Sequence, residues 1–191
     1  MSNHKFLGGT LRKIWSTETQ EVRDHLLRLD AESRRMRFAH TVADSFIEDY
    51  VERLSPDTSI MYGYFDRGVL AGTAELRKLA DDWAPDAEAA FSVEGAYREK
   101  GIGSELMGRI IRAARNRGVR HLYMSCLAEN AAMQKIAKKH EASLRFEYGE
   151  VVGDIVPAQP DYVSVMAEAV DDRVSYLMAV LDLSKRQARV A

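Results

Sequence analysis

This chain has a single cysteine and only four prolines among its 191 residues. One cysteine excludes an intrachain disulfide and favours a reducing compartment. The sequence also lacks a run of the roughly 18 to 20 apolar residues that a membrane-spanning helix requires. Residues 1–9 contain no apolar segment long enough for a signal peptide. We therefore expect a cytoplasmic protein that has no membrane partner.

An excess of charge of either sign is lacking as well. The 27 lysine and arginine residues nearly balance the 29 acidic residues, which leaves a net charge of −2. Proteins whose main partner is nucleic acid usually carry a clear positive excess, so we expect no nucleic-acid partner. The five histidines show no metal-ligand spacing, and we predict no metal site.

The most informative part of the sequence is a change of pattern in the middle of the chain. Residues 87–93 read as a strand, residues 98–103 as a glycine-containing turn and residues 104–117 as a helix. A strand, a turn and a helix in this order aim free backbone N–H groups and the positive end of the helix dipole at one spot. Such a spot suits a pyrophosphate group.

The turn itself narrows the choice of ligand. Gly101 and Gly103 allow close approach of an anion and tolerate positive φ, and Arg98 adds a charged donor. A P-loop would need a lysine directly after Gly103, and a dinucleotide fingerprint would need a third glycine where this chain has Leu106. Generic nucleotide binding is therefore a weak third hypothesis.

The remaining pattern is Arg98-x-x-Gly101-x-Gly103 after a strand that ends in Val93. It resembles the acyl-CoA pyrophosphate loop of the GNAT superfamily of N-acetyltransferases. This arrangement of strand, loop and helix is more specific than a Gly-x-Gly pair alone.

The resemblance continues downstream of the loop. Residues 119–127 are similar to the family's next strand, and residues 129–133 are similar to the asparagine-led start of its next helix. Roughly residues 10–157 can be fitted to the family pattern, most strongly residues 87–133. Residues 29–38 also resemble an element of bacterial protein-lysine acetyltransferases, in the region that usually forms the acceptor wall. The alternative is an ordinary amphipathic helix with exposed arginines.

The resemblance implies an α/β (α+β) fold. We expect a single GNAT-like domain with a mixed central sheet, middle strands that splay apart to receive the pantetheine arm, and helices on both faces. The N-acetyltransferase (GNAT) domain is expected to cover residues 1–157. Residues 158–191 are expected to form a C-terminal helical extension, packed on the domain or at a dimer interface.

Hydrophobic periodicity and turn residues predict the other elements. We expect strands at 10–15, 60–65, 69–79, 143–147 and 150–155, and helices at 20–29, 33–54 and from about 161 onward.

The predicted C-terminal helix has one apolar stripe at helical spacing. Its members are Met166, Val170, Val174, Leu177 and Leu181. Either the stripe packs on its own domain or it contributes to a homodimer, because a long exposed apolar stripe favours association.

The resemblance also assigns the cosubstrate, acetyl-CoA, and the residues that would bind it. In the family, a backbone N–H near the end of the fourth strand faces the thioester carbonyl, and this position corresponds to Val93. The other cofactor-binding positions are Arg98, Lys100, Gly101, Ile102, Gly103, Ser104 and Asn130.

Glu88 is our candidate for the general base. In strand register it shares a face with Ala90 and Ser92, and some family members place their proposed base at a similar position. If partly buried, it would have a raised pKa that suits proton transfer near neutral pH. Alternatively, Glu88 caps a strand end or pairs with a basic residue. Glu75, Glu129 or a chain of waters are rival bases.

The general acid is where the sequence departs from the family. Many members have a tyrosine seven residues after the asparagine, which protonates the departing thiolate, but this chain has Ala137 there. The Gly-Phe pair that often closes this helix is replaced by Glu141 and Ala142. Cys126 lies in an apolar strand and is expected to be a core cysteine rather than an acetyl carrier.

We therefore expect an acetyl-CoA-dependent N-acetyltransferase acting on a primary amine, either a protein lysine or a small molecule. The alternative is a non-catalytic acyl-CoA-binding sensor or regulatory module. A group of four arginines is expected to be a solvated helix face, or else to contact the 3′-phosphate of CoA. They are Arg112, Arg115, Arg117 and Arg120.

Overall fold

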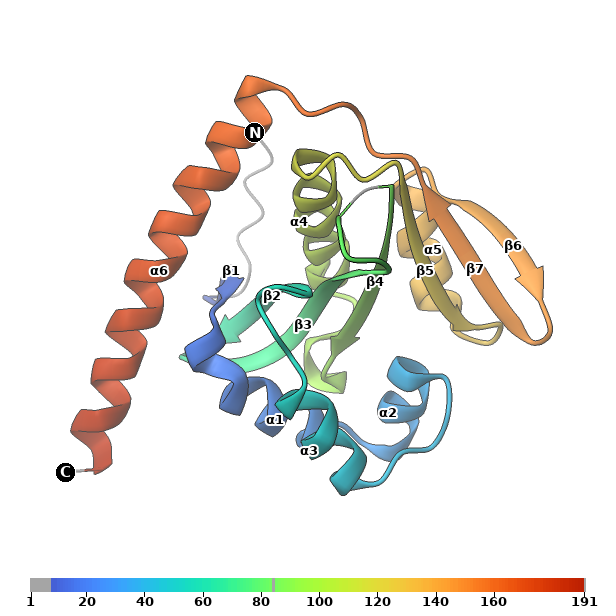
Figure 1. Ribbon diagram of the computed structural model, residues 1–191. Coiled ribbons are helices and arrows are strands. Elements are labelled where there is room, and N and C mark those ends of the chain that lie inside the picture. Colours follow the sequence, from blue (N-terminus) through green and yellow to red (C-terminus); the bar gives the residue numbers. More distant parts are fainter. Residues whose placement is uncertain (1–7, 84, 191) are drawn as a thin grey trace.

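Among the residues that the computed structural model describes, 8–83 and 85–190, seven strands form one mixed sheet with helices on both faces (Figure 1). The strand order is β1-β2-β3-β4-β5-β7-β6. The expectation about a signal peptide falls largely on residues 1–7, outside this range. The strands are β1 (Thr10–Ile14), β2 (Ser59–Asp66), β3 (Val69–Lys78), β4 (Asp86–Val93), β5 (His121–Leu127), β6 (Ser143–Glu147) and β7 (Glu150–Ile155). The helices are α1 (Thr19–Arg28), α2 (Ala31–Phe38), α3 (Asp44–Glu52), α4 (Ile102–Asn116), α5 (Ala131–Lys139) and α6 (Tyr162–Val190).

The middle of the sheet is splayed, as the family resemblance predicted. β4 and β5 are parallel and pair only over residues 86–88 and 121–123. On its other side, β4 pairs with β3 along residues 87–93. The edge of β4 that faces β5 is therefore unpaired beyond Glu88. This opening is the most important feature of the fold for function, because it exposes strand backbone in the interior of a sheet.

The two faces of the sheet are covered by different helices and have separate cores. α4 buries Ile102, Leu106 and Ile110 against one face, and α1 and α3 bury Leu26 and Ile47 against the other. Apolar residues at helical spacing on α4 and alternating apolar residues on the strands account for this arrangement. The mixed sheet with helices on both faces is thus confirmed.

The prediction of one helix over residues 33–54 is wrong. α2 ends at Phe38, Ala39 adopts a left-handed conformation with φ of 63°, and α3 begins at Asp44. The break lets Phe38 pack edge-to-face on Phe46, with ring centroids 5.4 Å apart. Tertiary packing of aromatic rings therefore overrides a helical pattern that is locally continuous.

α6 is the expected C-terminal helix, and it lies along the edge strand β1 and beside α4 (Figure 1). It packs on its own domain, but with its polar face inward. The predicted apolar stripe faces outward, and its five members are 43–63% exposed. No helix in the described part of the chain is long and apolar enough to cross a membrane.

The inward face of α6 also explains the arginine group on α4. Arg112 and Arg117 form ion pairs with acidic residues of α6, and Arg115 pairs with Asp161 directly before it. They are therefore not an unpaired solvated face, and this reading is wrong for these three residues, because α6 could not be placed from its pattern. A contact with a CoA phosphate stays a prediction.

Candidate functional site

The unpaired edge of β4 presents backbone N–H groups to the gap beside β5. The N–H of Glu94 donates to the carbonyl of Ala71 on the β3 side, at 3.0 Å. Consecutive N–H groups of a strand point to opposite sides. The N–H groups of Val93, Phe91 and Ala89 are therefore directed toward the gap. This places the expected main-chain donor, Val93, at the gap.

The segment after β4 turns sharply into α4. Glu99 and Gly101 both have positive φ, at 61° and 84°. The N–H of Glu105 donates to the carbonyl of Gly101 at 3.1 Å, one turn into the helix. The N–H groups of residues 102–104 precede this bond and project from the helix end. Together with the helix dipole they have the geometry that suits an anion, and binding of an anion here stays a prediction.

The two glycines of the turn have different roles. Gly101 supplies the positive φ, and a Cβ there would meet no atom within 4 Å. Gly103 makes room for a neighbour instead, because a Cβ there would lie 2.9 Å from Cδ1 of Ile136 in α5. Gly101 thus shapes the turn before α4, whereas Gly103 lets α5 pack against the first turn of α4.

Two basic side chains flank the turn. Arg98 donates to the hydroxyl of Ser33 at 2.6 Å and to the carbonyl of Val93 at 3.1 Å. Lys100 donates to the carbonyl of Ala96 at 2.7 Å. In the described part of the chain neither forms an ion pair with a carboxylate. Both can therefore turn to a phosphate without breaking a salt bridge.

Two other expected ligands of the cosubstrate already have local partners. The hydroxyl of Ser104 lies 3.0 Å from Nε2 of His140 and accepts from Lys139 at 2.9 Å. Oδ1 of Asn130 accepts from the N–H of Met133 at 3.1 Å and so caps α5. Ser104 can contribute its backbone N–H, and Asn130 its Nδ2 group.

Glu88 lies at the point where β4 and β5 separate, opposite Tyr123 in the strand register. Its carboxylate accepts from Arg77 at 2.6 Å, and its side chain is 33% exposed. Pairing with a basic residue was the alternative reading of this position. Glu88 therefore forms this ion pair and also lies beside the gap, so that Arg77 holds its carboxylate where the gap begins.

The two rival carboxylates are placed less favourably. Glu75 is buried, and its oxygens accept from Ser59 at 2.8 Å, from Arg37 at 3.0 Å and from Tyr50. Glu129 is more than half exposed and is paired with Arg35. Glu75 is saturated by donors, and Glu129 lies in the surface loop between β5 and α5. Glu88 therefore remains the best-placed base of the three.

A buried polar chain that sequence reasoning missed supports the end of β4. Thr73 and Ser92 are linked by a hydroxyl–hydroxyl bond of 2.8 Å, and Ser92 lies 2.8 Å from Nε2 of His25. Nδ1 of His25 lies 3.0 Å from Glu94, which also accepts from Arg28 at 2.9 Å. His25 and Ser92 are far apart in the sequence, so no local pattern signals the contact.

The protonation state of His25 decides which groups donate and which accept in this hydrogen-bond network. Burial lowers the pKa of His25 below its ordinary value, although Glu94 opposes the shift. A neutral imidazole donates from Nδ1 to Glu94 and accepts at Nε2 from Ser92. The network thus anchors Ser92 and Glu94, the residues on either side of Val93, to α1. It fixes the strand end from which the turn departs.

α2 covers the splayed strands on the face opposite α4, where it contacts both β4 and β5. Its arginine side chains are 10–32% exposed and ion-paired, whereas the amphipathic-helix reading expected exposed arginines. Arg34 pairs with Asp44, Arg35 with Glu129 and Arg37 with Glu75. α2 is therefore a fixed wall beside the gap.

The position of the expected tyrosine is occupied by the fully buried Ala137. It packs in the core between α5 and the sheet, and it brings no hydroxyl to the gap. Cys126 is buried as expected, and burial raises the pKa of its thiol. The described residues also contain no cluster of three metal-ligating side chains.

A cavity of about 300 Å³ lies elsewhere, between β1, α1 and the loop that precedes β4. Trp15, Trp83 and Arg117 are among its lining residues, and none of the predicted site residues lines it. The candidate site is therefore the open gap and turn, not this cavity.

Comparisons with known proteins agree with this geometry. The model of the Acetyltransferase (GNAT) family matches residues 14–141. Acetyltransferase Pat of Mycolicibacterium smegmatis is 34% identical over 91 residues, which are 44% of this chain and 27% of that relative. The chain thus spans about a quarter of the length of this curated relative.

Solved structures share the fold. The GNAT domain of S. lividans PAT has a TM-score of 0.67 at 20% identity, over 78% of this chain and 90% of that one. YncA, a putative acetyltransferase from Salmonella typhimurium solved with its cofactor acetyl-CoA, has a TM-score of 0.58 at 18% identity, over 81% and 99% of the two chains.

Proposed function

Because this chain belongs to the GNAT family of acetyltransferases, we propose that it moves an acetyl group from acetyl-CoA to a primary amine. The acceptor would be a protein lysine or a small molecule. The observation that carries the proposal is the opening of β4 from β5 directly before a helix end that suits an anion. One feature suits a pantetheine arm and the other suits the pyrophosphate to which that arm is attached.

The chain's own groups would orient the cosubstrate. The pyrophosphate would accept from the N–H groups of Ile102, Gly103 and Ser104, with Arg98 and Lys100 adding positive charge. The pantetheine arm would then follow the unpaired edge of β4. A donor such as the N–H of Val93 would bind the thioester carbonyl and stabilise the oxyanion that forms during attack.

Transfer would need no covalent enzyme intermediate. The neutral amine attacks the thioester carbon, a C–N bond forms, and the C–S bond breaks as the oxyanion collapses. Glu88 would take the proton that the amine nitrogen loses, directly or through a water. The thiolate of CoA would take a proton from water or a nearby hydroxyl, because Ala137 offers none.

The acceptor would approach between α2 and the β4–β5 gap. This face carries Glu88 and Arg77 at the point of divergence, whereas α4 and α5 cover the opposite face. The buried single cysteine fits a reducing compartment, and the cytoplasm is the proposed location.

A second function is favoured by one observation. Ala137 is buried in the place where many relatives carry the tyrosine that protonates the thiolate. A non-catalytic acyl-CoA-binding sensor would keep the turn and the gap but would not need this acid. Binding of acetyl-CoA without turnover would identify that function.

The test is acceptor-dependent release of free thiol from acetyl-CoA, with a panel of amines and lysine peptides. The proposal predicts release in the wild type and a loss of about 10²-fold or more in Glu88→Gln. Glu129→Gln is the matched control, because it removes a carboxylate at the surface of the same region. Turnover that is unchanged in Glu88→Gln would reject Glu88 as the base, and no turnover with any amine would favour the sensor.

A further inference from the structure

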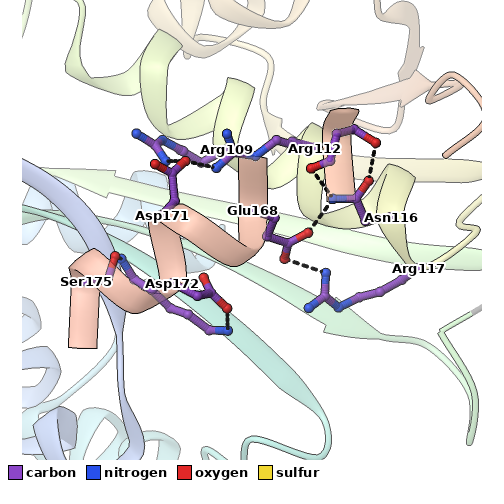
Figure 2. A network of polar contacts seen from close by, with 10 residues as sticks. Arg109, Arg112, Asn116, Arg117, Glu168, Asp171, Asp172 and Ser175 are labelled. Atoms are coloured by element: carbon purple, nitrogen blue, oxygen red, sulfur yellow. Dashed lines mark hydrogen bonds and ion pairs between the residues drawn. The ribbon is translucent and has the colours of Figure 1, made fainter. Parts of the chain in front are cut away.

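α6 is held on the domain by its polar side, and this attachment fixes which side faces outward. Asn116, the last residue of α4, and Arg117, its C-cap, donate to Glu168 at 2.5 and 2.8 Å (Figure 2). Arg109 and Arg112 of α4 both pair with Asp171 (Figure 2). These contacts lie along one side of the helix. α6 cannot rotate about its axis without breaking them.

The attachment continues onto the edge strand. Lys13 pairs with Asp172 at 2.6 Å, and its backbone N–H donates to the hydroxyl of Ser175 at 3.2 Å. Arg12, which is buried, adds a contact of 3.4 Å with Asp182. α6 therefore also covers the free N–H of an edge strand, which would otherwise invite pairing with another chain.

The opposite side of α6 carries an apolar stripe, which we call the outer stripe. Its central part, which runs from Val163 to Leu177, consists of Val163, Met166, Val170, Val174 and Leu177, each 43–74% exposed. The same face continues to Leu181, which is 58% exposed. Exposed hydrophobic side chains are common singly, but a continuous stripe of this length on a monomer is unusual. The central part spans about 21 Å along the helix.

We propose that the outer stripe is covered by the same stripe of a second copy of this chain, packed antiparallel. The spacing in the central part of the stripe is 3, 4, 4 and 3 residues, and it reads the same in both directions. A two-fold axis at Val170 therefore places Val163 opposite Leu177 of the other copy and Met166 opposite Val174. Such self-complementarity is what a two-fold interface requires.

The charges on α6 argue against other occupants. A helix that binds an anionic membrane surface needs lysines and arginines on its polar side. Between residues 168 and 172 the inward side of α6 is instead acidic, and Glu168, Asp171 and Asp172 already hold basic residues of α4, of its C-cap and of β1. The outer stripe contains only apolar residues, so it cannot form ion pairs with a charged partner. It can pack against the same apolar stripe of a second copy.

The exposed apolar surface of α6 extends beyond the outer stripe. Neighbouring apolar residues of the helix are 46–78% exposed, namely Tyr162, Val165, Tyr176, Val180 and Leu181. A stable interface needs roughly 800 Å² from each partner, so the second copy would cover part of these neighbours as well as the stripe. This proposal is independent of the enzymatic function, because the mass of the particle decides it.

The experiment is sedimentation analysis or light scattering of the full chain over a wide dilution series. We expect a particle of twice the 21.5 kDa chain mass that dissociates on dilution. Val170→Glu/Leu177→Glu should be monomeric at all concentrations, with unchanged helicity and acetyl-CoA binding. Ala169→Glu is the matched control, because Ala169 is exposed on α6 but lies off the stripe. It should remain dimeric.

Two cysteine variants test the orientation. Val170→Cys lies at the proposed axis and should give a cross-linked dimer on mild oxidation. Val163→Cys lies about 21 Å from its copy in the antiparallel arrangement and should not. The native Cys126 is buried and should not interfere. A wild-type chain that is monomeric throughout, a double variant that stays dimeric, or cross-linking at Val163 alone would each overturn the proposal.

Discussion

α4 and α6 are neighbouring helices with opposite relations to the protein interior. α4 turns Leu106 and Ile110 into the core and its arginines outward. α6 turns Glu168 and Asp171 toward those arginines (Figure 2), and its apolar stripe is exposed. Apolar periodicity thus identifies which residues share a helix face, but not what that face contacts. The apolar face of α4 is buried in the core of the domain, whereas α6 is attached to the domain by ion pairs of its polar face.

The largest expected difference between the two helices concerns leucine truncation. Leu106→Ala should lower the free energy of unfolding by about 2–5 kcal/mol, because it leaves a cavity in a close-packed core. Leu177→Ala should change it by less than about 0.5 kcal/mol, because Leu177 is exposed in the single chain. Urea unfolding at a concentration low enough to keep the chain monomeric measures both. Equal losses would contradict the assigned faces.

The ion pairs that hold α6 give a smaller effect. Glu168→Ala leaves Arg117 and Asn116 without their shared acceptor, and it should lower the free energy of unfolding by about 1–3 kcal/mol. The loss should be concentrated in α6. Hydrogen exchange should therefore show faster exchange in α6 while α4 stays protected. Uniform exchange through both helices would contradict attachment by these contacts.

The contribution of the buried hydrogen-bond network around His25 to folding stability should depend on pH, unlike that of a half-exposed ion pair. The pKa of His25 is lower in the folded chain than in the unfolded one, so the unfolded state binds more protons below about pH 6.5. The stability that depends on neutral His25 is complete above this pH and is lost as the pH falls toward the folded pKa.

Denaturant unfolding of wild type and His25→Gln over this pH range provides the measurement. The fall in stability below about pH 6.5 should be smaller in the variant. His140→Gln is a useful second variant, because burial also lowers the pKa of His140 and its contribution must be separated. An identical pH dependence in wild type and His25→Gln would contradict a buried neutral imidazole.

The helix ends give the smallest effect. α4 begins after Gly101, which has positive φ at no steric cost, whereas α5 is followed by Glu141 with φ of 63°. Glu141→Gly should therefore raise the free energy of unfolding by about 0.5 kcal/mol. Lys138→Gly, inside α5, should instead lower it by up to about 1 kcal/mol. Destabilisation by both variants would show that Glu141 has a role beyond its backbone conformation.

The sequence predicts well those features that depend on neighbouring residues. The strand 87–93, the turn around Gly101 and the helix after it are all local patterns, and the structure confirms them. The hairpin strands at 143–147 and 150–155 are also confirmed, because a two-residue turn with positive φ at Tyr148 and Gly149 joins them.

Features that depend on distant contacts were not predictable in the same way. The break after Phe38 depends on rings from α3, and the Ser92–His25 bond joins β4 to α1. The inward face of α6 depends on the arginines of α4, which the sequence alone could not pair with it. In each case the deciding partner is remote in the chain, so periodicity carries no information about it.

The central claim is that the turn at Gly101 and the gap beside β4 bind acetyl-CoA. Calorimetric titration with acetyl-CoA tests it, comparing wild type, Gly101→Glu and Gly68→Glu. Gly68 has nearly the same φ as Gly101, 82° against 84°, and equally open space, but it lies in the β2–β3 turn. Both variants therefore carry similar backbone strain, and only Gly101→Glu places a negative charge at the proposed phosphate position. The account predicts binding in wild type and Gly68→Glu and its loss in Gly101→Glu; binding retained in Gly101→Glu, or none in the wild type, would contradict it.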